Sequence, residues 1–309
     1  MLTLLRLAGH SVRLCEAGCA LTPDADGHVD VPSTWTSIGV QAFYGCVDLK
    51  TITIPSSVTS IQSRAFRESG LESLTVPGSI EQIGVAAFYK CKKLTSISLS
   101  NSLTHIGQTA FDSCTGLTSV TIPDSVVSMD PGAFQRCLSI TSLHIGAGMK
   151  DIAILTCNGC NSLTSLHIPG TVRSVGAGAF QFAKDLTSLT FDEGVTEIGQ
   201  SAFYGAINLP SVGFPHSLVK IDDYAFEHTR ALLNITFTES LTSLGEGAFM
   251  YTGVEFLSLP NSLTVLEKRA FRGSKALREI SLGSQVRSIG NGSFENCFAL
   301  ESVTFPETL

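Results

Sequence analysis

One short motif returns along nearly the whole length of the chain. The string AFYGCVDLKTITIPSSVTSI begins at residue 42, and close variants of it begin at residues 87 and 110. Aligned on the Phe of the AF pair, the copies follow one another in steps of 22 or 23 residues, with one step of 46 residues. The aligned column consists of Phe43, Phe66, Phe88, Phe111, Phe134, Phe180, Phe203, Phe226, Phe249, Phe271 and Phe294. Cys157 stands in the middle of the long step, so the chain has twelve units, and a repeat of this period predicts a stacked solenoid.

Each unit carries the same pattern of apolar positions after its Phe. The spacing L-x-x-I-x-I, as in Leu49, Ile52 and Ile54, contains an alternating pair of mostly β-branched residues. This alternation predicts one short strand per unit, with every second side chain pointing inward. A second apolar pair, such as Val58 and Ile61, predicts a second extended segment before the next AF pair.

A glycine often stands between the second apolar pair and the AF pair. It occurs at Gly84, Gly107, Gly176, Gly199, Gly245 and Gly290. Glycine there fits either a turn with positive φ or a close approach of two backbones. We expect the following xxAFxxC segment to form a short helical or 3-10 turn that packs its Phe inward. A unit of about 23 residues cannot bury these side chains alone, so neighbouring units must stack into one continuous core.

The composite string L-x-x-I-x-I-P-x-S-V-x-x-I-G-x-x-A-F-x-x-C resembles the repeat of the BspA-like leucine-rich-repeat family, from about residue 29 to residue 309. The resemblance implies a leucine-rich-repeat solenoid of about twelve stacked units, coiled right-handedly and curved. Each unit would contribute a short parallel β-strand, a second extended segment and a short helical or 3-10 turn. Members of the family are commonly cell-surface or secreted proteins implicated in adhesion, so the resemblance implies a protein ligand, with host and extracellular-matrix proteins among the candidates.

The two ends of the chain differ from the repeat. Residues 1–28 do not align, and we interpret them as an N-terminal capping segment before a solenoid of residues 29–309, because an open end would expose apolar side chains and strand edges. The chain stops at Leu309, halfway through a unit and without a visible cap. We expect that the natural protein continues, or that a partner or a second copy covers this end by self-association.

The first residues do not favour a secretory signal, because Arg6 interrupts a short apolar stretch that no basic segment precedes. A cytoplasmic location therefore stays open beside the cell-surface location that the resemblance implies.

Composition excludes several classes of protein. With 43% apolar and 15% charged residues, the chain has the material for a folded core. A net charge of −7 without a Lys/Arg cluster argues against a nucleic-acid partner or an anionic membrane surface. No apolar run approaches the roughly 20 residues that a membrane span requires.

The cysteines follow the repeat as well. Six of them share one column, three residues after the Phe position: Cys46, Cys91, Cys114, Cys137, Cys160 and Cys297. Other units have small residues in this column, which indicates that Cys serves there as a small buried side chain. The CxxC pair Cys157/Cys160 and the near match Cys15/Cys19 leave metal binding or redox chemistry as the alternative. Neighbouring members of the column are close enough for a disulfide, but parallel stacked side chains seldom have the required dihedral angle.

The exposed positions of the strands are almost uniformly Ser and Thr in the first seven units, which is typical of a solvated β-surface. His144 and His167 depart from this pattern and would lie roughly 5 Å apart, the spacing of adjacent strands. They flank the unit that lacks its Phe. Their neighbours Thr121 and Thr190 are poor metal ligands, so we interpret the pair as surface histidines and as a weaker candidate for binding.

A second departure lies further along the same face. It consists of Leu233, Asn234, Glu255, Phe256, Arg278 and Glu279, which we call the Phe256 patch. Exposed aromatic and aliphatic side chains beside Arg match the composition of protein-binding hot spots. Asn234 and Asn291 also begin the sequons NIT and NGS, and a glycan on Asn234 would lie within the patch.

The sequence contains no recognisable catalytic constellation. The seven His residues are scattered, no phosphate-binding or dinucleotide-binding motif occurs, and packing explains nearly every recurring residue. We therefore expect no enzyme activity, no cofactor and no metal. The expected function is protein recognition or adhesion through the exposed, concave sheet face; the alternatives are a structural spacer or oligomerising arm, and the repeat region of a longer signalling protein.

Overall fold

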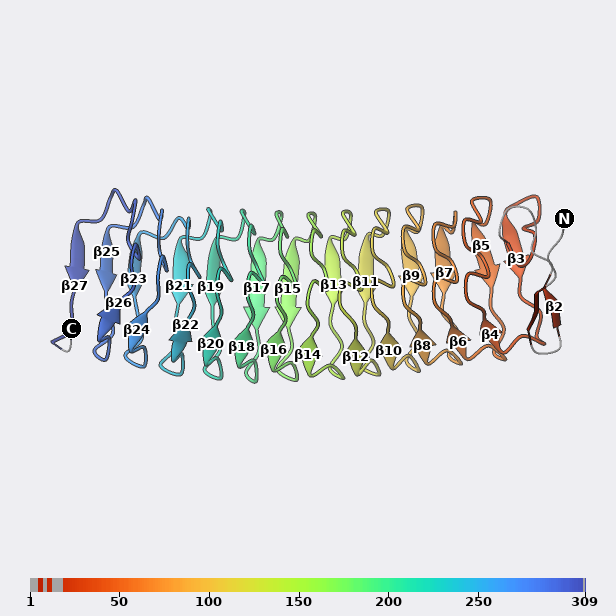
Figure 1. The fold of residues 1–309 in the computed structure, drawn as a ribbon, viewed down its shortest axis with the longest axis horizontal. Helices are drawn as coiled ribbons and strands as arrows, with labels where there is room; N and C mark the ends of the chain where they lie inside the picture. The colour runs from red at the N-terminus through yellow and green to blue at the C-terminus, as the bar shows by residue number, and fades with distance from the viewer. Residues whose placement is uncertain (1–4, 8–9, 13–18, 308) are drawn as a thin grey trace.

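The units stack into one elongated solenoid, which Figure 1 shows as two rows of short strands in a nearly straight array. The computed structural model describes residues 5–7, 10–12, 19–307 and 309. The first row consists of β3 (His28–Asp30), β5 (Thr51–Thr53), β7 (Ser73–Thr75), β9 (Ser96–Ser98), β11 (Ser119–Thr121), β13 (Ser142–His144), β15 (Ser165–Ile168), β17 (Ser188–Phe191), β19 (Ser211–Gly213), β21 (Asn234–Thr236), β23 (Phe256–Ser258), β25 (Glu279–Ser281) and β27 (Ser302–Thr304).

The second row is formed by shorter strands from the second apolar pair of each unit. It consists of β4 (Ser37–Ile38), β6 (Ser60–Ile61), β8 (Gln82–Ile83), β10 (His105–Ile106), β12 (Ser128–Met129), β14 (Asp151–Ile152), β16 (Ser174–Val175), β18 (Glu197–Ile198), β20 (Lys220–Ile221), β22 (Ser243–Leu244), β24 (Val265–Leu266) and β26 (Ser288–Ile289). A further pair, β1 (Leu5–Leu7) and β2 (His10–Val12), is antiparallel and precedes the repeats.

Strands of neighbouring units pair in parallel, with equivalent positions opposite one another. Ser119 pairs with Ser142, and Val120 pairs with Leu143. This register turns each position of the unit into a column along the solenoid, as the repeat predicts. The expected solenoid of about twelve parallel units is therefore confirmed.

The Phe column forms one row of buried, stacked rings. The ring centroids of Phe88 and Phe111 lie 4.9 Å apart, and those of Phe111 and Phe134 lie 5.0 Å apart, with interplanar angles of 3° and 2°. All three side chains are fully buried. A second run of stacked rings extends from Phe180 to Phe294.

The xxAFxxC segment forms consecutive turns, and the described residues contain no helix, so the expected helical or 3-10 turn is replaced by this arrangement. In the second unit the backbone N–H groups of Ala65 and Ser69 donate to carbonyls three residues earlier. Arg64 and Glu68, which flank the Phe, both have a φ of 58°. Such left-handed residues interrupt a right-handed helix. With no helix among the described residues, none of them forms a helix long and apolar enough to cross a membrane.

The recurring glycines are explained by close backbone approach. A Cβ on Gly84 would lie 2.7 Å from the backbone nitrogen of Ser63 in the preceding unit. Neither Gly84 nor its five equivalents has a positive φ, so the second of the two expected reasons is the correct one.

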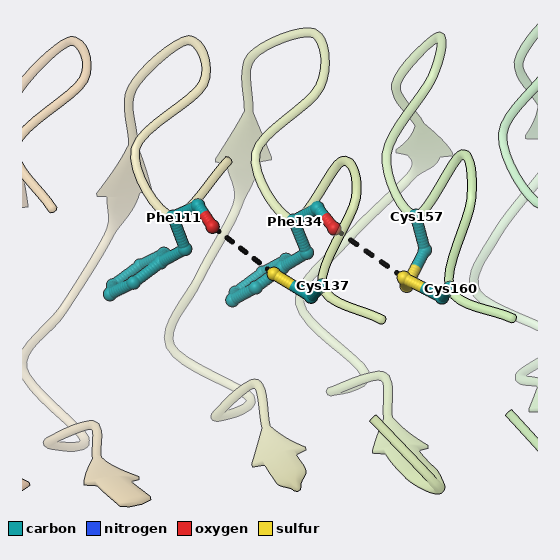
Figure 2. The surroundings of a disulfide bond; sticks show 5 residues. All are labelled: Phe111, Phe134, Cys137, Cys157 and Cys160. Atoms are coloured by element: carbon teal, nitrogen blue, oxygen red, sulfur yellow. Dashed lines mark hydrogen bonds between the residues drawn. A yellow bond between two sulfur atoms is a disulfide. The ribbon is translucent and has the colours of Figure 1, made fainter. Parts of the chain in front are cut away.

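The Phe row is interrupted in the sixth unit, where Cys157 and Cys160 form a disulfide (Figure 2). The second row also divides there, between β12 and β14, whereas the first row continues with β13 paired to β15 through Ser142 and Ser165. We call this unit the junction, because it separates two runs of stacked Phe rings, which we call the first and second blocks.

The described part of the expected capping segment is tied to the first unit. Cys19 forms a disulfide with Cys46 and an isolated antiparallel bridge with Phe43. Cys15 lies outside the described residues. The capping role of residues 1–28 stays a prediction.

Candidate binding surface

The exposed side of the first row, which we call the main face, is regular over most of its length. Thr95, Thr118 and Thr141 illustrate the column just before the strands, where each hydroxyl donates to a backbone carbonyl of the preceding unit, at 3.1–3.3 Å. These hydroxyls are therefore already hydrogen-bonded within the solenoid. A shallow hollow of about 310 Å³ lies over β5, β7 and β9, between Ser73 and Ser96.

The structure divides the Phe256 patch into two adjacent columns. Asn234, Phe256 and Glu279 begin β21, β23 and β25, in the column of Ser119. Leu233, Glu255 and Arg278 lie one position earlier, in the column of Thr95. All six side chains are exposed, with Phe256 at 59% and Leu233 at 49%. Phe256 lies beside Glu279, because these two residues are register partners.

A break in the first row lies beneath the patch. The unit that ends at Val254 has one residue fewer after its Phe than most units have. Gly253 lies close to the preceding unit, because a Cβ there would lie 2.5 Å from the carbonyl oxygen of Arg230. Strands β21 and β23 belong to different sheets, as do β9 and β11 earlier in the first row.

The charged groups of the patch are available to a partner. Within the described residues, Glu255, Arg278, Glu279 and the neighbouring Glu301 form no ion pair. On the side of the solenoid formed by the xxAFxxC segments, which we call the turn side, carboxylates do form ion pairs. Glu246 pairs with Arg269, and Glu295 pairs with Arg272.

In the described part of the chain, no group of three or more His, Cys, Asp or Glu side chains could hold a metal ion, and the two histidines of the main face belong to no such group. Both side chains are exposed. His167 Nδ1 lies 3.0 Å from Thr190 Oγ1, and its Nε2 lies 3.2 Å from Asp192 Oδ2. These contacts orient one imidazole along the strand ends, while His144 follows the same column one unit earlier.

The cysteine column is buried, as predicted, and it has a further role that the sequence analysis missed. Cys114 and Cys137 donate their S–H groups to the carbonyls of Phe88 and Phe111, each at 3.1 Å. Both thiols are free, so neighbouring members of the column are not bridged. Burial raises the pKa of the Cys114 and Cys137 thiols, and it raises that of Cys91 to about 11. These thiols are poor nucleophiles, because the thiolate is the reactive form.

Two pairs of cysteines are bridged. Cys157 and Cys160 form a disulfide, as do Cys19 and Cys46. The CxxC spacing was the signal for the first. The second joins a residue before the repeats to the cysteine column, and no periodicity reveals such a pairing.

The turn side carries aromatic and charged contacts that the sequence analysis also missed. The Arg67 guanidinium lies between two tyrosine rings, 5.6 Å from the Tyr44 centroid and 4.8 Å from the Tyr89 centroid. His228 stacks on Tyr251 with centroids 4.6 Å apart. These groups occupy the two columns after the Phe, whose composition varies too much to stand out in an alignment of units.

The fold and its columns define a leucine-rich-repeat solenoid with one extended sheet face. The family described as "BspA type Leucine rich repeat region (6 copies)" matches residues 27–141, 81–210, 150–276 and 196–309. The chain belongs to this family, and the resemblance stated from its motif is confirmed.

Solved structures of a leucine-rich repeat protein and of a pneumococcal antigen share the fold. A leucine-rich repeat protein from Bacteroides ovatus is 25% identical with a TM-score of 0.80, over 91% of this chain and 79% of that one. The pneumococcal vaccine antigen PcpA is 20% identical with a TM-score of 0.56, over 98% and 96% of the two chains. A leucine rich cell surface protein from Faecalibacterium prausnitzii is 22% identical with a TM-score of 0.48, over 98% and 94%. No curated protein matches the chain.

Proposed function

We propose that this protein is a non-enzymatic recognition or adhesion module that binds a protein ligand through the main face of its solenoid. The observation that carries the proposal is the Phe256 patch. There the Ser and Thr columns give way to exposed Phe256 and Leu233 beside charged groups. Large exposed apolar side chains next to Arg are typical of interface hot spots and are unfavourable on a surface that contacts only water.

Two further observations support a location outside the reducing cytosol. The chain forms two disulfides, Cys19–Cys46 and Cys157–Cys160, and disulfides persist mainly in oxidising compartments. The description of a similar structure as a vaccine antigen agrees with this location. We therefore place the protein at the cell surface or among secreted proteins.

A surface-binding screen against purified extracellular proteins tests the proposal. The double variant F256A/R278A should lose binding that the wild-type protein shows. The control S142A/S165A changes two exposed residues of the same column outside the patch and should bind as the wild type does. Equal binding by F256A/R278A would remove the patch from the proposal.

A further inference from the structure

We propose that the ligand of the Phe256 patch is a basic protein segment that carries apolar side chains. This inference rests on the proposed function and adds the chemistry of the partner.

The apolar centre is a protruding side chain. Phe256 stands at the start of β23 and is 59% exposed, although the same column holds Ser in most other units. The column two residues further along the strands holds Gly213, Thr236, Ser258 and Ser281 in this region. Phe256 therefore projects beside a column of small residues. Its ring offers an apolar contact to a ligand segment that binds along that column. Leu233 extends the apolar surface on the side of β21.

The rim of this centre is acidic. Glu255 precedes Phe256 in the chain, Glu279 is its register partner in β25, and Glu301 follows in the unit after that. Arg278 is the single cation among them, and no ion pair forms between these groups in the described chain. Their carboxylates outnumber the guanidinium and remain without a partner. Complementary charge favours a ligand with Lys or Arg near its apolar side chains and disfavours an acidic ligand.

The hydroxyl columns of the earlier units do not offer the same chemistry. Their threonines already donate to backbone carbonyls, and few charged groups lie on that part of the main face. Glu72 occupies the position of Glu255 in the second unit, but its neighbour is Ser73 instead of a Phe. This residue supplies a matched control, because it is an exposed carboxylate in the same column without the apolar centre.

Binding of three short synthetic peptides, measured by fluorescence anisotropy on the full chain, tests the inference. The peptides alternate Leu with Lys, Leu with Glu, and Ser with Lys. The Leu–Lys peptide should bind at least about tenfold more tightly than either other peptide, since it alone supplies both the apolar and the cationic contacts. Equal binding of the Leu–Glu peptide, or no binding of the Leu–Lys peptide, would overturn the inference.

Variants assign the binding to the patch. Phe256→Ala should weaken binding of the Leu–Lys peptide about tenfold, as truncation of an interface anchor does. E255Q/E279Q should weaken it severalfold and make the remaining affinity less dependent on salt, because screening acts on the charged contacts. E72Q should bind as the wild type does. Unchanged binding by E255Q/E279Q would contradict the stated ligand chemistry.

The two proposals fail in different ways. If F256A/R278A abolishes binding in the surface screen while the peptides show no preference for positive charge, the partner chemistry is wrong and the recognition function stands. If neither F256A/R278A nor Phe256→Ala alone has an effect in that screen, the patch is not the binding surface and both proposals about it are wrong.

Discussion

A single side chain, the Phe of each unit, links the sequence period to the fold. Within the first block, the rings of Phe66, Phe88 and Phe111 are fully buried between the rings of the neighbouring units, at centroid distances near 5 Å. The backbone N–H of the Phe also donates to the Ala carbonyl of the next unit, as from Phe88 to Ala110 at 2.7 Å. One residue thus contributes a stacking contact and a hydrogen bond along the axis.

Truncating one ring measures this contribution. Phe88→Ala should lower the free energy of unfolding by about 3–5 kcal/mol, because it leaves a cavity between two stacked rings. Phe256→Ala removes an equally large but exposed side chain and should change stability by no more than about 0.5 kcal/mol. Urea unfolding followed by circular dichroism gives both values, and similar losses would contradict the burial pattern.

A buried thiol makes stability depend on pH at the alkaline end. Burial raises the pKa of Cys91 from 9.0 to about 11, so folding favours its protonated form. The corresponding stabilisation is complete below the pKa of the unfolded chain and is lost as the pH rises from 9 to about 11. Cys91→Ser lacks this thiol. Over that pH range, its free energy of unfolding should therefore fall by about 2–3 kcal/mol less than that of the wild-type protein. Parallel curves for the two proteins would contradict the assigned shift.

A single unit tolerates the loss of its Phe where another feature compensates. In the junction, Cys157 and Cys160 replace the ring by a disulfide within one turn, and Met149 stands where Val126 stands one unit earlier. Figure 2 shows the disulfide next to Phe134, at the level of the Phe row. The flexible Met side chain adds apolar volume in the unit that lacks a ring.

Removing this disulfide isolates its effect on stability. C157A/C160A should lose about 2 kcal/mol more than C114A/C137A, since a cross-link of so short a loop contributes roughly that amount by restricting the unfolded chain. The control deletes two buried thiols of the same column that form no disulfide. Urea unfolding of the oxidised proteins checks the difference, and equal losses would mean that the disulfide does not stabilise the junction.

Along the full length of the chain, the junction separates two blocks of stacked Phe rings. Stability in such an array is nearly a sum of unit terms and contacts between neighbouring units, so a weak contact lowers cooperativity. The ring centroid of Trp35, the single Trp, lies 6.5 Å from that of Phe43, so Trp fluorescence follows unfolding of the first block. In C157A/C160A, the Trp fluorescence transition should separate from the circular dichroism transition, whereas in C114A/C137A they should stay closer together. Coincident transitions in both variants would show that the blocks unfold as one.

The architecture was predictable because each column repeats one packing environment twelve times. The burial of Phe88, the strand at Ile52 and the close approach at Gly84 all follow from that repetition. Features that occur once were not predictable in the same way. The Cys19–Cys46 disulfide joins the cysteine column to a residue outside the repeats, and Arg67 lies between two tyrosines in a column whose residue type changes from unit to unit.

The turns were mispredicted for a related reason. Left-handed residues flank the Phe position of every unit. Some are glycines, such as Gly45 and Gly132, but others are Arg64, Glu68 and Tyr251, which have no common preference for positive φ. Their conformation is set by the stacked neighbours, so the sequence of one unit contains little sign of it.

Amide hydrogen exchange of the Phe column gives the decisive measurement. The amides of Phe66, Phe88, Phe111, Phe203 and Phe226 each donate to the next unit and should exchange slowly and at similar rates. That result would show that the stacked Phe row connects each unit to the next. Exchange of these amides as fast as in an unstructured chain would show that no such row exists.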